Sequence, residues 1–400
     1  MEWRILLRKI HLSQIAFICI SYTLIFNTLS ILNYGRSNTA LQTNAYPRLA
    51  TLFAVFISFT ASKIIISSRN SLSIIERMLF GLLFVFWGYV LANNYLHGAR
   101  FSLQALLFPI TILGLLISAE LNQMLRTISL AAVAIIVICV WMMVTKENLA
   151  FYNIGTFVEE KAIIGSRLLT GPFSHPNSLA AIMLIISPAI LSLSLKFRIP
   201  LLLSSFVIIV LSGSRTSIYS FILWIFILIL PVSLRTTKTI LFLGTITSFI
   251  LMLVTPFVIG SSNIFSNRGD IWIESRDYIF REPFFGYGAD FYANELSRNS
   301  IFMRSAITGH NLMIDLAIKY GFVGLFLLII FFTISTFRVY SGTDFLIIQG
   351  SYLFLFAVSG ITETHLNFTS MGEVGFFFWV IFPIVILKRA DPSPSNVKDF

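Results

Sequence analysis

The chain has 400 residues, of which 56% are hydrophobic and 12% are charged. With 40 phenylalanines and a mean hydropathy of +0.86, this composition excludes a soluble globular protein, because such a fold would expose a large apolar surface. The net charge of +10 comes from basic residues between apolar segments, so it indicates membrane topology and not nucleic-acid binding.

About twelve apolar runs are long enough to cross a hydrocarbon core, which takes about 20 helical residues. We expect them near residues 10–32, 48–66, 73–92, 101–118, 127–145, 174–195, 199–213, 216–234, 238–260, 311–337, 344–360 and 373–388. The run at 199–213 is short, which predicts a tilted or interrupted helix. The predicted fold class is therefore all-α, with a single polytopic membrane domain over residues 1–400.

The first run follows three basic residues and has no clear cleavage site after it, so we interpret it as a helix and not as a signal peptide. With the amino terminus inside, every inner connection is basic, through Arg69 and Arg77, Arg126, Lys196 and Arg198, Arg235 and Lys238, Arg338, and Lys388 and Arg389. This topology places both termini, including a tail at 389–400, in the cytoplasm. Outside it places a loop at 146–173 and a large loop at 261–310, between the ninth and tenth helices.

Thiol and metal chemistry are not indicated. Cys19 and Cys139 lie inside apolar runs, where they behave as small hydrophobic residues. The five histidines are far apart and lack the spacing of metal ligands. We therefore expect a metal-independent protein without a cofactor.

Within the large loop, residues 268–280 have apolar side chains at helical spacing and stop before Pro283. We expect an amphipathic helix that lies on the membrane surface. Arg268, Trp272 and Arg276 share one face, so two guanidinium groups would flank an indole at the headgroup level. The following Phe285-Gly286-Tyr287-Gly288 predicts a tight, irregular turn.

A polar, titratable motif, Thr308-Gly309-His310-Asn311, stands at the mouth of a predicted membrane helix and is followed by Gly321-Phe322-Val323-Gly324. The helix macrodipole disfavours an imidazolium at a helix start, so we expect a neutral His310 that can accept a proton near neutral pH. Asn311 would then orient the acceptor. The alternative interpretation is that His310 caps the helix or is a hydrogen-bonded interfacial residue.

Four short motifs follow one another along the chain between about residues 165 and 325. They are Gly171-Pro172-Phe173-Ser174-His175-Pro176-Asn177, Ser212-Gly213-Ser214-Arg215-Thr216, Arg268 to Trp272 continuing to Pro283 and Gly286-Tyr287-Gly288, and His310-Asn311 with its downstream glycines. In these motifs the chain resembles the family of O-antigen ligases and of O-antigen, capsule and exopolysaccharide polymerases of bacterial cytoplasmic membranes.

The resemblance implies a fold related to class C glycosyltransferases and an external active site. It further implies an undecaprenyl-diphosphate-linked glycan as donor, a glycan acceptor, and a partner protein that sets chain length. The donor's lipid tail requires entry from the bilayer, and its diphosphate concentrates negative charge at the interface.

Arginines suit such a diphosphate because their planar fork binds phosphate oxygens in bidentate fashion. Arg215 stands at the end of a membrane helix, where its charge is costly without an anionic partner, so we assign it to the diphosphate. Arg268 and Arg276 are expected to help. Further candidates for substrate contact are Arg167, Arg100, Trp272, His175 and Asn177.

Most of these residues also have a structural interpretation. Arg215 could be a snorkelling residue, and Trp272 a membrane anchor. Arg268 and Arg276 could face lipid headgroups, and His175 could serve the helix that opens at Pro176-Asn177. Glu363 and His365 could line an acceptor path or form a simple polar loop.

The predicted function is polymerisation of lipid-linked oligosaccharide repeat units into a surface polysaccharide, with inversion at the anomeric carbon. One alternative is a ligase that passes the glycan to lipid A core or to protein. The other is a flippase or transporter for the same lipid, which predicts ionisable residues along the interior of the bundle.

Overall fold

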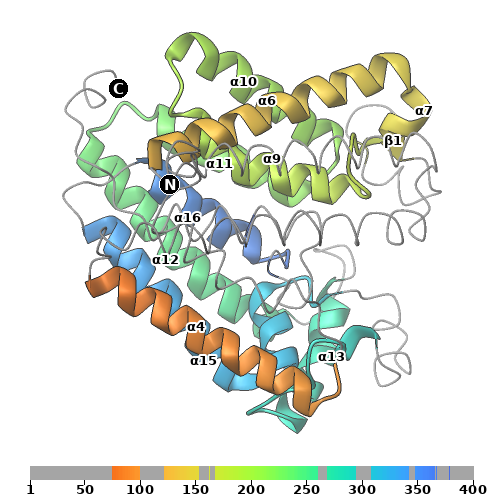
Figure 1. Cartoon of the computed structure of the whole chain (residues 1–400), viewed down its shortest axis with the longest axis vertical. Coiled ribbons are helices and arrows are strands. Elements are labelled where there is room, and N and C mark those ends of the chain that lie inside the picture. Colours follow the sequence, from red (N-terminus) through yellow and green to blue (C-terminus); the bar gives the residue numbers. More distant parts are fainter. Residues whose placement is uncertain are drawn as a thin grey trace, which may run out of the picture.

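The structure is a computed structural model of the chain, and it describes residues 74–99, 121–152, 162, 167–259, 268–293, 308–341, 347–364, 366 and 378. These residues form mainly helices (Figure 1). The long ones are α4 (Ile74–Leu96), α6 (Leu121–Thr145), α9 (Pro176–Ile190), α10 (Leu195–Leu211), α11 (Arg215–Ile229), α12 (Leu234–Val258), α13 (Arg268–Arg281), α15 (Leu312–Ser341) and α16 (Ile347–Gly360).

Short elements connect some of these helices. A single turn, α7 (Glu147–Ala150), follows α6, and a 3-10 turn, η2 (Phe291–Ala293), follows α13. Two strands, β1 (Phe151–Tyr152) and β2 (Leu168–Leu169), pair in antiparallel fashion, with Phe151 opposite Leu169.

Four helices are long and apolar enough to cross a membrane: α4, α6 over Met124–Thr145, α12 and α15. Shorter apolar helices are α9, α11 and α16. The chain is therefore a multi-pass membrane protein with a helical fold. The predicted runs at 10–32, 48–66, 101–118 and 373–388 lie outside the described residues, apart from Phe378, so the total of about twelve stays a prediction.

The core is built around α9 and α16, since both are buried along almost their whole length. Helix α9 packs against α6, α10 and α16, while α16 lies along α12 and also contacts α11 and α15. Helices α4 and α15 pack together on the other side of α12 (Figure 1). The α16 helix thus joins the α6–α9–α10–α11 group to the α4–α12–α15 group.

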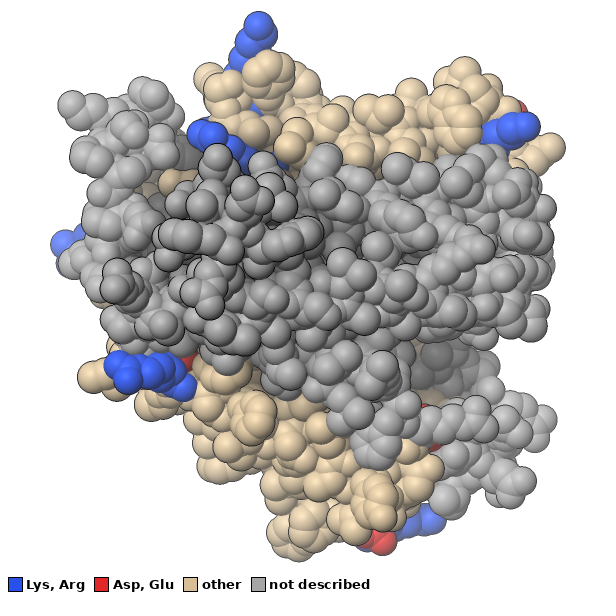
Figure 2. All heavy atoms as spheres, in the orientation of Figure 1, with Lys and Arg blue, Asp and Glu red and all other residues tan. Residues whose placement is uncertain are grey.

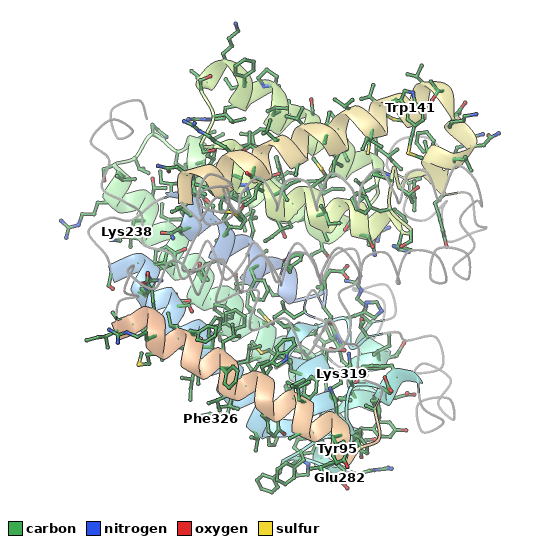
Figure 3. The ribbon with its side chains drawn as sticks, viewed as in Figure 1. Tyr95, Trp141, Lys238, Glu282, Lys319 and Phe326 are labelled. Atoms are coloured by element: carbon green, nitrogen blue, oxygen red, sulfur yellow. The ribbon has the colours of Figure 1, made fainter. Side chains whose placement is uncertain are left out.

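One end of the bundle collects positive charge. The Arg338 Nη2 atom lies 2.7 Å from Glu76 Oε1 and ties the end of α15 to the start of α4. We call this the basic end and define it by Arg77, Arg126, Lys196, Arg198, Arg235, Lys238 and Arg338. In Figure 3, Lys238 marks this end, whereas Tyr95, Glu282 and Lys319 lie at the opposite end. Figure 2 shows several Lys and Arg side chains at the left-hand edge of the molecule, and others at its top, right and lower edges.

Helix α15 is interrupted at Gly321, which has a φ of 62° and a ψ of −170°. The expected single helix is therefore two helical pieces, and the break leaves backbone groups without helical partners. The turn after α13 supplies those partners through the hydrogen bonds Tyr287 N to Ile318 O at 2.9 Å, Gly288 N to Lys319 O at 2.9 Å, and Phe322 N to Pro283 O at 2.7 Å. The predicted tight turn is thus inserted into the break of a membrane helix.

The glycines on both sides allow this insertion. A β-carbon on Gly321 would lie 2.1 Å from Phe284 O, and one on Gly286 would lie 2.4 Å from Ile318 O. Both glycines have positive φ angles, which side chains strongly disfavour. The start of α15 is therefore fixed to the loop that follows α13, and this arrangement positions the His310 motif.

Candidate active site

His310 has an unusual backbone conformation. Its φ angle is 49°, and among the described residues it is the one non-glycine residue with a positive φ. The left-handed region costs a residue of this type about 1–3 kcal/mol, and such strain persists only where the surroundings fix it. The side chain is half-buried and lies just before α15. The structure therefore holds an imidazole in a costly position at the start of a broken membrane helix.

Gly309 shows how that conformation is fixed. Its carbonyl oxygen accepts a hydrogen bond from Trp272 Nε1 at 2.9 Å, and its N–H donates to Asp315 Oδ1 at 2.9 Å. A β-carbon at this position would lie 2.8 Å from Tyr292 Oη and 2.9 Å from Asp315 N. Both backbone groups of Gly309 are thus held from opposite sides, in a space that admits only a glycine.

Asn311 holds the other side of His310. Its Oδ1 accepts from Met313 N at 2.9 Å and from Ile314 N at 3.0 Å, so it caps α15. Its Nδ2 donates to Met252 O at 3.0 Å and to Ile361 O at 2.9 Å. The side chain is fully buried and uses two donors and two acceptor positions within the protein. In this structure the hydrogen bonds of the Asn311 side chain therefore join the start of α15 to α12 and to Ile361.

Asp315 belongs to a buried ion pair. Its Oδ2 lies 2.8 Å from Lys319 Nζ, and the two side chains are 1% and 10% exposed. The Lys319 ammonium also lies 5.4 Å from the centre of the Tyr292 ring. Burial, reinforced by the Asp315 carboxylate, raises the pKa of the Tyr292 hydroxyl well above its usual range. Tyr292 is therefore neutral and unsuited to act as a general base.

A short segment after α16 brings three helix starts together. We call Ile361, Thr362 and Glu363 the junction loop. Besides the bond from Asn311, the loop receives Arg268 Nη1 on Thr362 O at 2.5 Å, and Thr216 Oγ1 lies 2.6 Å from Thr362 Oγ1. The starts of α11, α13 and α15 therefore meet at this loop. Helix starts carry partial positive charge and exposed N–H groups, which favour a bound anion.

Two predicted arginines lie beside the junction loop. Arg268 Nη2 lies 2.7 Å from Glu363 Oε1, with side chains 14% and 17% exposed. Arg215 is exposed at the first position of α11, directly before Thr216. The structure thus brings Arg215, Arg268 and His310 to the same junction, although they are far apart in the sequence.

The face of α13 differs from its expected orientation. The helix forms and ends at Arg281, as predicted, but Trp272 is fully buried within the protein, so its indole does not face lipid headgroups. Arg276 donates from Nε to Pro256 O at 2.7 Å and from Nη2 to Ile259 O at 2.7 Å. These carbonyls belong to the end of α12, where a cation compensates the helix dipole. The face of α13 that carries Trp272 and Arg276 therefore packs against the rest of the protein and supports the candidate site.

The remaining candidates make other contacts. His175 caps α9 and accepts from Asn177 N at its Nδ1, at 3.1 Å, as its structural interpretation predicts. Arg167 pairs with Glu147 of α7 at 2.7 Å, and both side chains are exposed. Neither of these two contacts involves the junction loop. Arg100 and His365 lie outside the described residues.

Asp315, Lys319 and Thr362 also belong to this junction, although the sequence did not predict them as site residues. The first two carried a signal, because an acidic and a basic residue four positions apart inside an apolar helix predict a buried pair. Thr362 carried none, since its role depends on the meeting of distant helix starts.

Comparison with known proteins bears on this junction. No curated protein matches the chain. Residues 200–329 match the family model described as O-antigen ligase. The matched segment contains Arg215, all of α13 and the His310 motif. This match, over about a third of the chain, supports an assignment to the O-antigen ligase and polymerase family.

Proposed function

We propose that the protein polymerises undecaprenyl-diphosphate-linked oligosaccharide repeat units by an inverting, metal-independent transfer at the junction loop. The observation that carries the proposal is the strained His310, held beside two arginines where three helix starts meet. This arrangement sets a proton acceptor next to an anion-binding surface, as the transfer requires.

In the proposed reaction, an acceptor hydroxyl oxygen attacks the anomeric carbon of the donor sugar. The bond from that carbon to the diphosphate oxygen breaks, and the lipid diphosphate leaves with the electron pair. His310 takes the hydroxyl proton. Attack from the face opposite the leaving group inverts the anomeric configuration.

The charge that develops on the diphosphate needs stabilisation. Arg215 is exposed at the start of α11 and suits bidentate contact with the phosphate oxygens. Arg268 already holds a carboxylate, Glu363, at 2.7 Å, so its guanidinium is oriented for an oxyanion. We assign Arg215 direct contact and Arg268 a supporting contribution.

The other residues of the site position these groups. Asn311, Trp272 and Asp315 fix the backbone on both sides of His310, and Arg276 fixes α13 on α12. Preorganisation of this kind contributes to catalysis because a small displacement of the base costs a large part of the rate.

A ligase is the second candidate, because the matching family model is described as O-antigen ligase. Both reactions use the same donor and the same base, and they differ in the acceptor. A transporter is less well supported, since the buried charged side chains in the described part of the chain are Glu76, Asp315 and Lys319. Glu76 lies in the first turn of α4, and Asp315 and Lys319 lie in the first piece of α15, before its break at Gly321. The long second piece of α15, up to its last turn, and the middle of α4 are apolar.

The test is an assay with purified protein in nanodiscs and the undecaprenyl-diphosphate-linked repeat unit alone. A polymerase forms a ladder of lengthening glycans. A ligase forms none until lipid A core is supplied, and then transfers the glycan to it. Exchange of His97, an exposed histidine at the same end, for alanine is the control and retains activity. Absence of transfer to every acceptor would contradict the proposal.

A further inference from the structure

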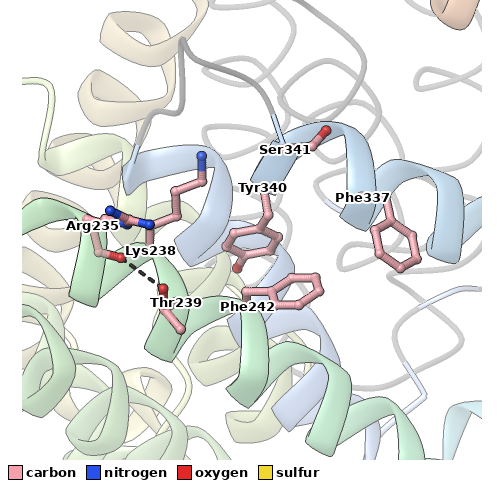
Figure 4. Close-up of a pocket in the computed structure, with 7 residues that line it drawn as sticks. All are labelled: Arg235, Lys238, Thr239, Phe242, Phe337, Tyr340 and Ser341. Carbon is pink, nitrogen blue, oxygen red and sulfur yellow. Dashed lines mark hydrogen bonds between the residues drawn. The ribbon is translucent and has the colours of Figure 1, made fainter.

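A cavity of about 290 Å³ lies at the basic end (Figure 4). It is at the start of α12, whereas Asn311 joins the junction loop to Met252, near the end of that helix. It opens between the start of α12 and the end of α15. Cations line it on one side through Arg235 and Lys238, and aromatic rings line it on the other through Phe242, Phe337 and Tyr340. The volume is close to the lower limit for small-ligand sites.

The aromatic wall is held in place by contacts within the protein. Tyr340 Oη donates to Gly350 O at 2.9 Å and lies 3.0 Å from Thr245 Oγ1. The Phe242 ring meets the Tyr340 ring edge-on, with centres 5.3 Å apart, and lies 6.0 Å from the Phe337 ring. The cavity therefore has a preformed apolar wall that does not depend on a ligand.

The cationic side favours an anion. Arg235 and Lys238 stand in the first turn of α12, which contains no acidic residue. Cations are disfavoured there by the macrodipole, whereas an anion would be attracted by both side chains and by the helix start. Basic residues at the inner ends of membrane helices are common, but that tendency does not account for an aromatic-lined cavity between them.

The surroundings of the cavity identify the class of ligand. Phe337 lines the cavity and is 54% exposed, and Leu243, one residue after Phe242, is 57% exposed. An apolar surface thus continues from the cations along the side of the bundle. A ligand with a phosphate group and attached acyl chains matches both parts, while a soluble phosphate compound matches only the first.

We propose that this cavity binds the phosphate headgroup of an anionic phospholipid in the leaflet at the basic end. Arg235 and Lys238 contact the phosphate, and Phe337 and Leu243 lie beside the upper part of an acyl chain. The site is separate from the proposed glycan transfer and does not depend on it.

Native mass spectrometry of the delipidated protein tests the proposal. Titration with phosphatidylglycerol, and with phosphatidylcholine of the same chains, gives the affinity of the first bound lipid. We expect phosphatidylglycerol to bind at least about tenfold more tightly and this preference to disappear in the double variant Arg235→Gln/Lys238→Gln. The control Arg126→Gln/Lys196→Gln removes two exposed charges from the same end and keeps the preference.

Two further arms distinguish the alternatives. Thr239→Trp fills the cavity but keeps both cations. We expect it to abolish the preference for phosphatidylglycerol as well, so the test does not depend on whether the charge variant folds. Displacement of phosphatidylglycerol by millimolar inorganic phosphate or glycerol phosphate would show that the ligand is a soluble phosphate compound and would overturn the lipid assignment. An equal loss of the phosphatidylglycerol preference in both double variants would show that general surface charge causes the preference. That result would also overturn the proposal.

Discussion

The hydrogen bond between Gly309 and Asp315 offers a direct test of how His310 is positioned. Asp315 does two things: it accepts the Gly309 N–H at 2.9 Å and neutralises Lys319 at 2.8 Å. Substitutions can separate these roles. Asp315→Asn keeps an acceptor and removes the charge, Asp315→Asn/Lys319→Met keeps the acceptor and removes both charges, and Asp315→Leu/Lys319→Met removes the acceptor as well.

The structure sets the expected magnitudes. Asp315→Asn leaves the Lys319 ammonium, whose side chain is 10% exposed, without its carboxylate, and breaking such a pair typically costs about 3–5 kcal/mol of folding stability. In Asp315→Asn/Lys319→Met no buried charge remains, so stability recovers. In Asp315→Leu/Lys319→Met the Gly309 N–H loses its acceptor, which costs about 1–3 kcal/mol.

The two double variants therefore have the same charge but differ in the acceptor that they offer to the Gly309 N–H. We expect Asp315→Asn/Lys319→Met to transfer glycan within a few-fold of the wild-type rate. Loss of this hydrogen bond should displace His310, so we expect the transfer rate of Asp315→Leu/Lys319→Met to fall by about 5- to 150-fold. The assay measures single-turnover transfer and thermal unfolding in the same nanodisc preparation. Wild-type transfer by the leucine variant would refute the positioning role of Asp315.

Three other substitutions test neighbouring contacts. Gly309→Ala should displace the segment around His310, because its β-carbon would lie 2.8 Å from Tyr292 Oη. We expect the transfer rate to fall while donor binding persists, and an unchanged transfer rate would contradict the close packing of Gly309 against Tyr292. Trp272→Phe leaves the buried Gly309 O without its donor and should cost about 1–3 kcal/mol of stability together with part of the transfer rate, which calorimetry and the transfer assay measure. Arg215→Lys keeps the charge but loses bidentate geometry, so the KM for the lipid-linked donor should rise; an unchanged KM would indicate a structural arginine.

Much of the fold could be predicted from apolar run length. The predicted runs that fall on described residues, including 127–145, 216–234 and 344–360, correspond to helices with ends shifted by a few residues. Run length could not reveal the break in α15. The apolar character continues through Gly321, and the backbone that fills the break comes from a turn about 35 residues earlier in the chain.

The face of α13 shows a second limit. The spacing of Arg268, Trp272 and Arg276 correctly placed them on one side of a helix. Periodicity states which residues share a face, but not what that face contacts. Because the end of α12 offers carbonyl oxygens to Arg276 and Gly309 offers one to Trp272, the face packs inward and not toward lipid headgroups.

Some residues of the candidate site could be selected from the sequence. His310 and Arg215 stood out because a polar or charged side chain at the end of an apolar helix costs free energy unless it has a partner or a function. The role of Asn311 as a buried cap could not be foreseen, since it depends on carbonyl groups of Met252 and Ile361, which are distant in the chain.

The most direct test of the central claim is the single-turnover rate of glycan transfer by His310→Ala with saturating donor and acceptor. Because a positioned base contributes about 10²–10⁴-fold, we expect the rate to fall by at least about a hundredfold while unfolding temperature and donor binding stay close to those of the wild type. Transfer within a few-fold of the wild-type rate would contradict the assignment of His310 as the base.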